Sequence, residues 1–165
     1  MPQTEVTLNS AVALDGLAAD SGFGNVDSKE LWGYSAKFGV AVCFSTDDGN
    51  GVDTPVDNSK TIAGITVRGV HDEFLKTKKG AYDQHEVIPV ATRGRVWCRL
   101  FTGSPDVVAG GKVYAKTQAS ATFDDAGSIT GEDTTADPDN IEVTNARFLS
   151  AGSAGDLVVV EINLP

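Results

Sequence analysis

The chain has 165 residues, of which 41% are hydrophobic and 22% are charged, and its formal net charge is −10 at pH 7. This length suits one domain with a single core, in which folding hides roughly 70% of the unfolded surface. The strong negative charge argues against nucleic acid and membranes as partners, because basic surfaces are expected there.

The charge is unevenly distributed along the chain. Residues 1–59 hold nine acids against two lysines, and residues 121–165 hold nine acids against one arginine. Residues 60–100 hold eight bases against four acids. The basic middle is therefore suited to an acidic protein partner.

Residues 1–30 predict an extended N-terminal arm, and residues 31–165 predict the folded β-domain. The first part shows neither strand alternation nor a helical stripe, and a buried loop of this length is improbable. Its larger hydrophobic side chains are costly to leave in water, so we expect them to contact a partner. These residues are Leu14, Leu17, Phe23 and Val26. A disordered tail is the alternative interpretation.

From Trp32 onward, short runs with β-strand patterns alternate with turn sequences. Their number, about eight to ten, and the lack of an amphipathic helix predict an all-β fold, either a small β-barrel or a jelly-roll-like sandwich. Pro89 predicts an edge or a bulge for its run. The strand runs are residues 37–46, 61–70, 86–91, 94–101, 110–118, 120–123, 128–130, 145–151 and 156–165.

Cys43 and Cys98 both lie in apolar, strand-like runs, which favours buried free thiols over a disulfide. The first ten residues lack a signal-peptide pattern, and no run approaches the ~20 apolar residues of a membrane span. We therefore expect the protein to be made in a reducing compartment.

No sequence motif indicates catalysis or a cofactor. The Asp- and Gly-rich residues 47–53 resemble a calcium loop but lack the closing glutamate, so a turn is the preferred interpretation. The acidic residues 131–140 are interpreted as a solvated loop.

Residues 71–86 contain both histidines, each beside an acidic residue, with three lysines between them. If a hairpin brought His71 near His85, a weak metal site would be conceivable, but the lysines would repel a divalent cation. An exposed charged loop is the preferred interpretation, and we expect no metal, cofactor or catalytic residue.

Several segments in a characteristic order run nearly from end to end: GLAADSGFGNVDS, FGVAV, TIAGITV, HEVIPVATRGRVWCRL, VVAGGKVYA, DDAGSIT and VTNARFLSAGSAGDLVVVEINLP. Their order and spacing resemble the structural cement (decoration) proteins of tailed-bacteriophage capsids. The resemblance implies a non-enzymatic β-barrel or jelly-roll protein on the outer surface of the virion capsid, made in the cytoplasm of a bacterial host. The implied partners are the major capsid protein and further copies of the chain, as a homodimer or homotrimer.

Two other functions remain open at this point. A host-surface or carbohydrate-binding β-module on the virion would use exposed aromatic side chains, with Trp32, Tyr34, Tyr82 and Tyr114 as candidates. A metal-dependent enzyme would use His71 and His85.

Overall fold

The computed structural model describes residues 14–19, 24–46, 50–69, 80–119 and 125–165, and it confirms the predicted all-β fold. Within these ranges there is no helix, and therefore none that could cross a bilayer. The strands are β1 (Asn25–Glu30), β2 (Ala36–Lys37), β3 (Ala41–Phe44), β4 (Val52–Asp53), β5 (Ile62–Thr66), β6 (Ala81–Tyr82), β7 (Val87–Arg99), β8 (Lys112–Ala115), β9 (Ile129–Thr130), β10 (Ile141–Phe148) and β11 (Leu157–Asn163).

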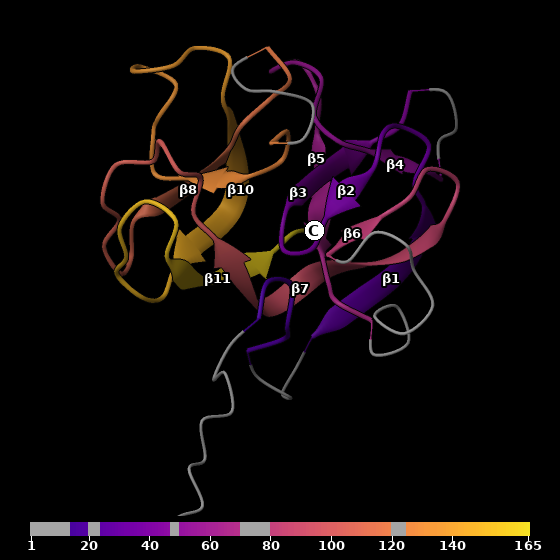
Figure 1. Ribbon diagram of the computed structural model, residues 1–165, viewed down its shortest axis with the longest axis horizontal. Coiled ribbons are helices and arrows are strands. Elements are labelled where there is room, and N and C mark those ends of the chain that lie inside the picture. Colours follow the sequence, from indigo (N-terminus) through magenta and orange to yellow (C-terminus); the bar gives the residue numbers. More distant parts are fainter. Residues whose placement is uncertain (1–13, 20–23, 47–49, 70–79, 120–124) are drawn as a thin grey trace, which may run out of the picture.

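Nine strands form one antiparallel sheet in the order β4-β3-β5-β7-β11-β10-β8-β9, with β1 paired to β7, and β2 and β6 form a small second sheet (Figure 1). The large sheet is curled, so that β3 near one end of the strand order lies beside the residues that precede β9 at the other end. The Ala41 N–H of β3 donates a hydrogen bond to the Gly127 carbonyl at 2.8 Å. This closure resembles that of a barrel, and the jelly-roll alternative gains no support from the strand order.

The central strand β7 is thirteen residues long and unites two runs that the sequence analysis treated separately. The expectation of an edge or a bulge at Pro89 agrees only locally with the structure, since β7 is a central strand. Pro89 pairs with Ser28 of β1 on one side, and on the other side its carbonyl accepts a hydrogen bond from the Val67 N–H at 2.9 Å. The β5–β7 ladder ends beside it, at Thr66 and Val90. The missing N–H of proline therefore falls where a ladder ends.

Two hydrophobic clusters lie on the two faces of the curled sheet. Strand β7 contributes to both: Val96 and Cys98 belong to the larger cluster, and Ile88 and Val90 belong to the smaller one. The larger cluster is completed by the inward residues of β8, β10 and β11, where alternate positions are buried. Period-2 alternation along these strands separates core from surface.

Both cysteines are free and buried, which confirms the prediction from their apolar surroundings. Burial, together with the nearby charge of Asp53, raises the pKa of the Cys43 thiol to about 11. Complete burial also raises the pKa of the Cys98 thiol. Neither thiol is a reactive nucleophile in the folded protein.

The described parts of the expected arm lie along one edge of β7. Residues 25–30 form β1, a strand that the sequence analysis did not predict, and residues 16–19 continue the pairing beside Arg95 and Trp97. Trp97 donates to the Leu17 carbonyl at 2.8 Å, and its carbonyl accepts from the Gly16 N–H at 2.7 Å. The division into an arm at 1–30 and a domain at 31–165 stays a prediction.

The strands around residues 112–130 include a pairing that was not predicted. Strand β9 pairs with β8, through Tyr114 with Thr130 and Ala115 with Ile129. The expected first strand at residues 120–123 lies outside the described residues.

Replacement of Gly39 by alanine should loosen residues 16–19 from β7. Gly39 has φ +70°, and an added Cβ would lie 2.8 Å from the Gly16 nitrogen and 2.9 Å from the Trp97 carbonyl oxygen. We expect Gly39→Ala to lower the free energy of unfolding by about 2–3 kcal/mol. Hydrogen exchange at the Trp97 amide should also accelerate.

Gly110→Ala is the matched control for this prediction. Gly110 has φ +85° but no atom within 4 Å of an added Cβ. We expect a loss of about 1 kcal/mol from backbone strain alone, without faster exchange at Trp97. Equal exchange rates in the two variants would contradict the role of Gly39.

Candidate interaction surface

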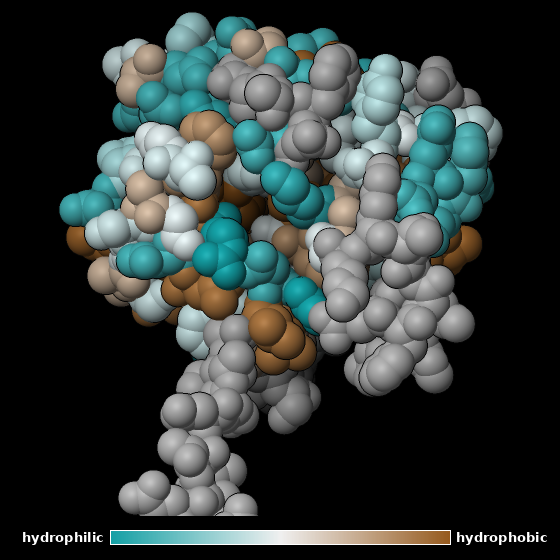
Figure 2. Space-filling view, viewed as in Figure 1, coloured by the Kyte–Doolittle hydropathy of each residue, from teal (hydrophilic) through white to brown (hydrophobic). Residues whose placement is uncertain are grey.

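Hydrophobic side chains remain exposed along the edge of β7 that pairs with residues 16–19 and with β1. Leu14 is 41% exposed, Leu17 is 39% exposed and Val26 is 49% exposed. Figure 2 shows hydrophobic residues at the lower edge of this view, beside the segment drawn in indigo in Figure 1. Phe23, the fourth predicted contact residue, lies outside the described residues. Val87, which the sequence analysis did not select, is 69% exposed and lies on the same face of the β1–β7 pair as Val26.

The outer face of the sheet carries a row of charged side chains across four strands. Arg95 of β7 pairs with Glu161 of β11, Glu161 with Arg147 of β10, and Arg147 with Lys112 of β8. Trp97 pairs with Val159 in the adjoining row. We call this surface the arginine–tryptophan face, consisting of Arg95, Trp97, Arg99, Lys112, Arg147, Val159 and Glu161.

Glu161 is the acidic centre of this face. Arg147 Nε donates to Glu161 Oε2 at 2.7 Å, and Arg95 Nε donates to Oε1 at 3.3 Å. The hydrogen bond from Arg147, with a second from Arg95, holds the pKa of Glu161 below its usual value. Lys112 is paired with Glu142 instead, so the two arginines around Glu161 leave one excess positive charge at the centre of this face, in a protein of net charge −10.

Most of this face was missed by the sequence analysis, although a signal was present. In β7, Arg93, Arg95, Trp97 and Arg99 alternate with inward residues, so that their side chains share one face. The basic middle of the chain is evident from its composition, whereas the placement of these side chains at every second residue was not predicted. The four-strand row additionally requires the register of β8, β10 and β11.

A buried lysine organises the acidic loop of residues 131–140. Lys116 is only 3% exposed, and its Nζ donates to Glu132 and, at 2.9 Å, to Asp137. The Nζ also lies 5.3 Å from the ring centre of Phe101. Burial disfavours the charged form, but the hydrogen bonds from Lys116 to Glu132 and Asp137 outweigh it, and the pKa of Lys116 is raised.

The interpretation of this segment as a merely solvated loop is therefore incomplete. Asp133 accepts backbone hydrogen bonds from Thr135 and Ala136, and buried Asn140 donates to the Glu132 carbonyl at 2.9 Å. These bonds give the loop a defined shape. The loop leaves several acidic and hydroxyl side chains at the surface: Asp133, Thr134, Thr135 and Asp139.

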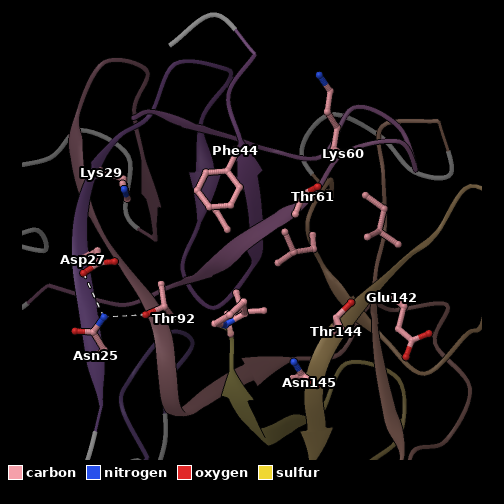
Figure 3. A pocket seen from close by; sticks show the side chains of 15 residues that line it. Asn25, Asp27, Lys29, Phe44, Lys60, Thr61, Thr92, Glu142, Thr144 and Asn145 are labelled. Atoms are coloured by element: carbon pink, nitrogen blue, oxygen red, sulfur yellow. Dashed lines mark hydrogen bonds between the residues drawn. The ribbon is translucent and has the colours of Figure 1, made fainter. Parts of the chain in front are cut away.

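A hollow of about 570 Å³ lies between β1 and β10 (Figure 3). Asn25, Asp27 and Lys29 of β1 form one wall, and Glu142, Thr144 and Asn145 of β10 form another. Further lining residues come from β3, β5, β7, β10, the two residues before β5 and the end of the chain: Phe44, Lys60, Thr61, Ile62, Ala63, Thr92, Ile141, Leu164 and Pro165. The lining mixes polar and apolar groups.

The described residues do not assemble a metal site. No group of three or more His, Cys, Asp or Glu side chains in the described ranges is placed to hold a metal ion. His71 lies outside those ranges, so the alternative in which His71 approaches His85 stays untested. His85 packs against Trp32 with ring centres 5.6 Å apart, and its Nδ1 lies 3.4 Å from Glu30 Oε1.

The aromatic candidates for a carbohydrate site are not gathered together. Tyr82 and Tyr114 are buried in the core and so do not present their rings to a ligand. Tyr34 is exposed and Trp32 is half-buried.

Comparison with known proteins decides the family. A model of the structural cement protein family (E217 gp24/Pam3 gp6) matches residues 1–163. The chain belongs to this family. As a structural cement protein, it has a capsid-stabilising decoration role.

A similar fold occurs in a solved structure titled "The capsid of Myoviridae Phage XM1". The two chains are 22% identical, with a TM-score of 0.71 over 99% of this cement protein and 98% of the other chain. None of the curated proteins compared with the chain matches it.

Removal of the buried Lys116 charge should destabilise the cement protein. In Lys116→Met, Glu132 and Asp137 would face each other without their cation. We expect a loss of about 3 kcal/mol in the free energy of unfolding, measured by urea denaturation. Addition of Glu132→Gln and Asp137→Asn should recover part of it. A triple variant less stable than Lys116→Met would contradict this account.

The same cluster should make stability depend on pH. Partial burial opposes ionisation of Asp137, but the hydrogen bond from Lys116 outweighs it and lowers the pKa of Asp137 below 3.8. The ionised Asp137 thus contributes to the free energy of unfolding above pH 3.8, and this contribution is lost as the pH falls through the lower pKa that Asp137 has in the folded protein. The stability difference between the wild-type protein and Lys116→Met should shrink there. Urea denaturation at pH 7 and pH 3 measures this change, and an unchanged difference would contradict it.

Proposed function

We propose that this cement protein binds the major capsid protein at the outer surface of the virion capsid and connects neighbouring subunits without catalysis. The family's structural role supports the non-enzymatic assignment. The observation that carries the proposal is the exposed hydrophobic edge of β7 beside the arginine–tryptophan face. Here Leu14 and Leu17 provide apolar area next to arginine side chains.

The composition of this surface suits a protein interface. Tryptophan and arginine are enriched among residues that dominate binding energies, because both combine large contact areas with directional hydrogen bonds. The surface ion pairs of Glu161 contribute little to stability, so a partner carboxylate could share Arg95 and Arg147 at small cost. We therefore propose that the capsid surface facing these arginines is acidic.

The predicted contacts Leu14, Leu17, Phe23 and Val26 form the apolar part of the same proposal. Because residues 16–19 and 25–30 are hydrogen-bonded to β7, the described part of this edge is already ordered. Binding through an ordered edge loses less conformational entropy than binding through a free tail. Contacts with two capsid subunits would reinforce each other, since the second contact forms within one complex. A homodimer or homotrimer would multiply this effect.

Charged substitutions on the hydrophobic edge test the proposal. Leu14→Asp combined with Val26→Asp should weaken binding to capsids at least tenfold, because each carboxylate would lose water on contact with the partner. Cosedimentation of purified protein with undecorated capsids measures the affinity. The melting temperature should stay within a few degrees of wild type, because both side chains are exposed.

Val56→Asp combined with Val108→Asp provides the control. These side chains are 45% and 66% exposed and lie outside the edge. Capsid binding should stay at the wild-type level. Full affinity of the Leu14/Val26 variant, or equal loss in both variants, would refute the assigned surface.

A further inference from the structure

The hollow of about 570 Å³ between β1 and β10 has the size of a small-molecule site (Figure 3). Ligand pockets commonly measure about 300–1,000 Å³ and combine apolar surface with a few placed polar groups. The lining comes from β1, β3, β5, β7 and β10, which are distant in sequence. The hollow therefore exists only once these strands have taken their places in the folded protein.

One wall of the hollow is formed by alternate residues of β1. Asn25, Asp27 and Lys29 share one face of the strand, whereas Val26 of the hydrophobic edge lies on the opposite face. Asn25 Nδ2 donates to Thr92 Oγ1 at 3.0 Å and to Asp27 Oδ1 at 3.3 Å, as the dashed lines in Figure 3 show. Both hydrogens of the amide nitrogen are thereby engaged, which leaves the amide oxygen as an acceptor for a ligand.

A β-bulge in β10 gives the opposite wall two consecutive polar side chains. In the β8–β10 pairing the register shifts between Glu142 and Arg147, and Asn145 has φ +59°. Regular alternation would place Thr144 and Asn145 on opposite faces, but both are exposed and both line the hollow. Bulges commonly redirect a side chain, and a strained positive φ is most frequent at functional positions. The bulge therefore adds the Asn145 amide to the Thr144 hydroxyl in this wall.

The polar groups of the second wall are available to a ligand. Neither the Thr144 hydroxyl nor the Asn145 amide forms a hydrogen bond with another residue of the described ranges. Across the hollow, Asn25, Asp27 and Thr92 add an amide, a carboxylate and a hydroxyl group. Such a set of donors and acceptors suits a ligand with many hydroxyl groups. A peptide strand, in contrast, is recognised mainly through the backbone groups of a strand edge.

An exposed aromatic ring at the margin of the hollow points to the same class of ligand. Phe44, which was not among the aromatic candidates chosen from the sequence, is 44% exposed. Its ring offers an apolar face on which the C–H groups of a sugar ring can stack. Ile62 and Leu164 provide further apolar surface in the lining. The combination of a stacking ring with hydroxyl, amide and carboxylate groups favours a saccharide.

The charges around the hollow favour a saccharide that carries an acid. Lys29 and Lys60 lie on either side of Phe44 in the view of Figure 3. Neither lysine forms an ion pair with another described residue. Of the two acids in the lining, Glu142 is paired with Lys112 at 3.0 Å, which leaves only Asp27 to balance the two lysines. A ligand carboxylate would complement the excess positive charge.

We propose that the hollow between β1 and β10 binds a short oligosaccharide that carries a uronic or sialic acid. One sugar ring stacks on Phe44, and its hydroxyl groups are bonded to Asn25 and Asn145. The carboxylate lies near Lys60. Because Val26 is on the opposite face of β1 from this lining, the site is separate from the hydrophobic edge and does not rest on the proposed capsid contact.

Binding of the full-length protein to a panel of immobilised oligosaccharides tests the ligand class. The probes are short oligosaccharides that contain uronic or sialic acid, each beside a neutral oligosaccharide of the same length and linkage. We expect at least one acidic probe to bind at least tenfold more tightly than its neutral counterpart, with the Kd measured by titration calorimetry. If no acidic probe binds, or if the neutral counterparts bind equally well, the proposal is overturned.

Two variants and their matched controls locate the site with the acidic probe that binds. Phe44→Ala removes the stacking ring and Lys60→Met removes a charge, and each should weaken binding at least tenfold. Tyr34→Ala and Lys37→Met should bind like the wild-type protein. Tyr34 is 59% exposed and the Lys37 side chain is 50% exposed, and neither lines the hollow. Melting temperatures of all variants establish that they are folded.

Asn145→Gly supplies a third variant that keeps the backbone of the bulge, because glycine adopts a positive φ readily. It should also bind the acidic probe at least tenfold more weakly, with capsid cosedimentation unchanged. Wild-type affinity in all three hollow variants, or an equal loss in the controls, would place the ligand elsewhere and overturn the proposal. A loss of capsid binding in Phe44→Ala with unchanged saccharide binding would make the hollow a capsid contact and would also overturn it.

Discussion

The backbone pairing of β7 is the constraint on which the rest of the structure depends. Thirteen residues must satisfy hydrogen bonds along two edges, and they do so with β1, β5, β11 and residues 16–19. The same register places Val96 and Cys98 in the core and Arg95 and Trp97 outside. A slip of one residue would exchange these two sets, so core formation and the orientation of the interaction surface are specified together.

The all-β class, several turns and both buried thiols were predictable, because they follow from local patterns of apolar and turn residues. The unity of β7 was not, since Pro89 and Gly94 both indicate interruptions when neighbouring strands are unknown. Gly94 in fact takes φ +129° within the continuous strand. The Lys116 cluster was equally hidden. Lys116, Glu132 and Asp137 meet only after the β8–β9 pairing returns the chain beside itself.

The candidate surface shows the same division between local and long-range information. Exposure of Leu14, Leu17 and Val26 agrees with the reasoning that selected them as contact residues, but their partner remains a proposal. Their attachment to β7 could not be inferred, because it is made by backbone hydrogen bonds, which do not depend on the type of side chain. The charged row also depends on register, since Lys112, Arg147 and Glu161 are distant in sequence. Pairing converts scattered charges into one continuous patch.

The burial of Cys43 and Cys98 has a consequence for the chemistry of the protein under oxidising conditions. Their thiols are withdrawn from solvent and held protonated by raised pKa values, so little thiolate is present to be oxidised. Adjacent copies packed on one shell would otherwise be at high local concentration, where exposed thiols cross-link irregularly. Burial in the core thus prevents either thiol of the folded protein from forming a covalent link to a neighbouring molecule.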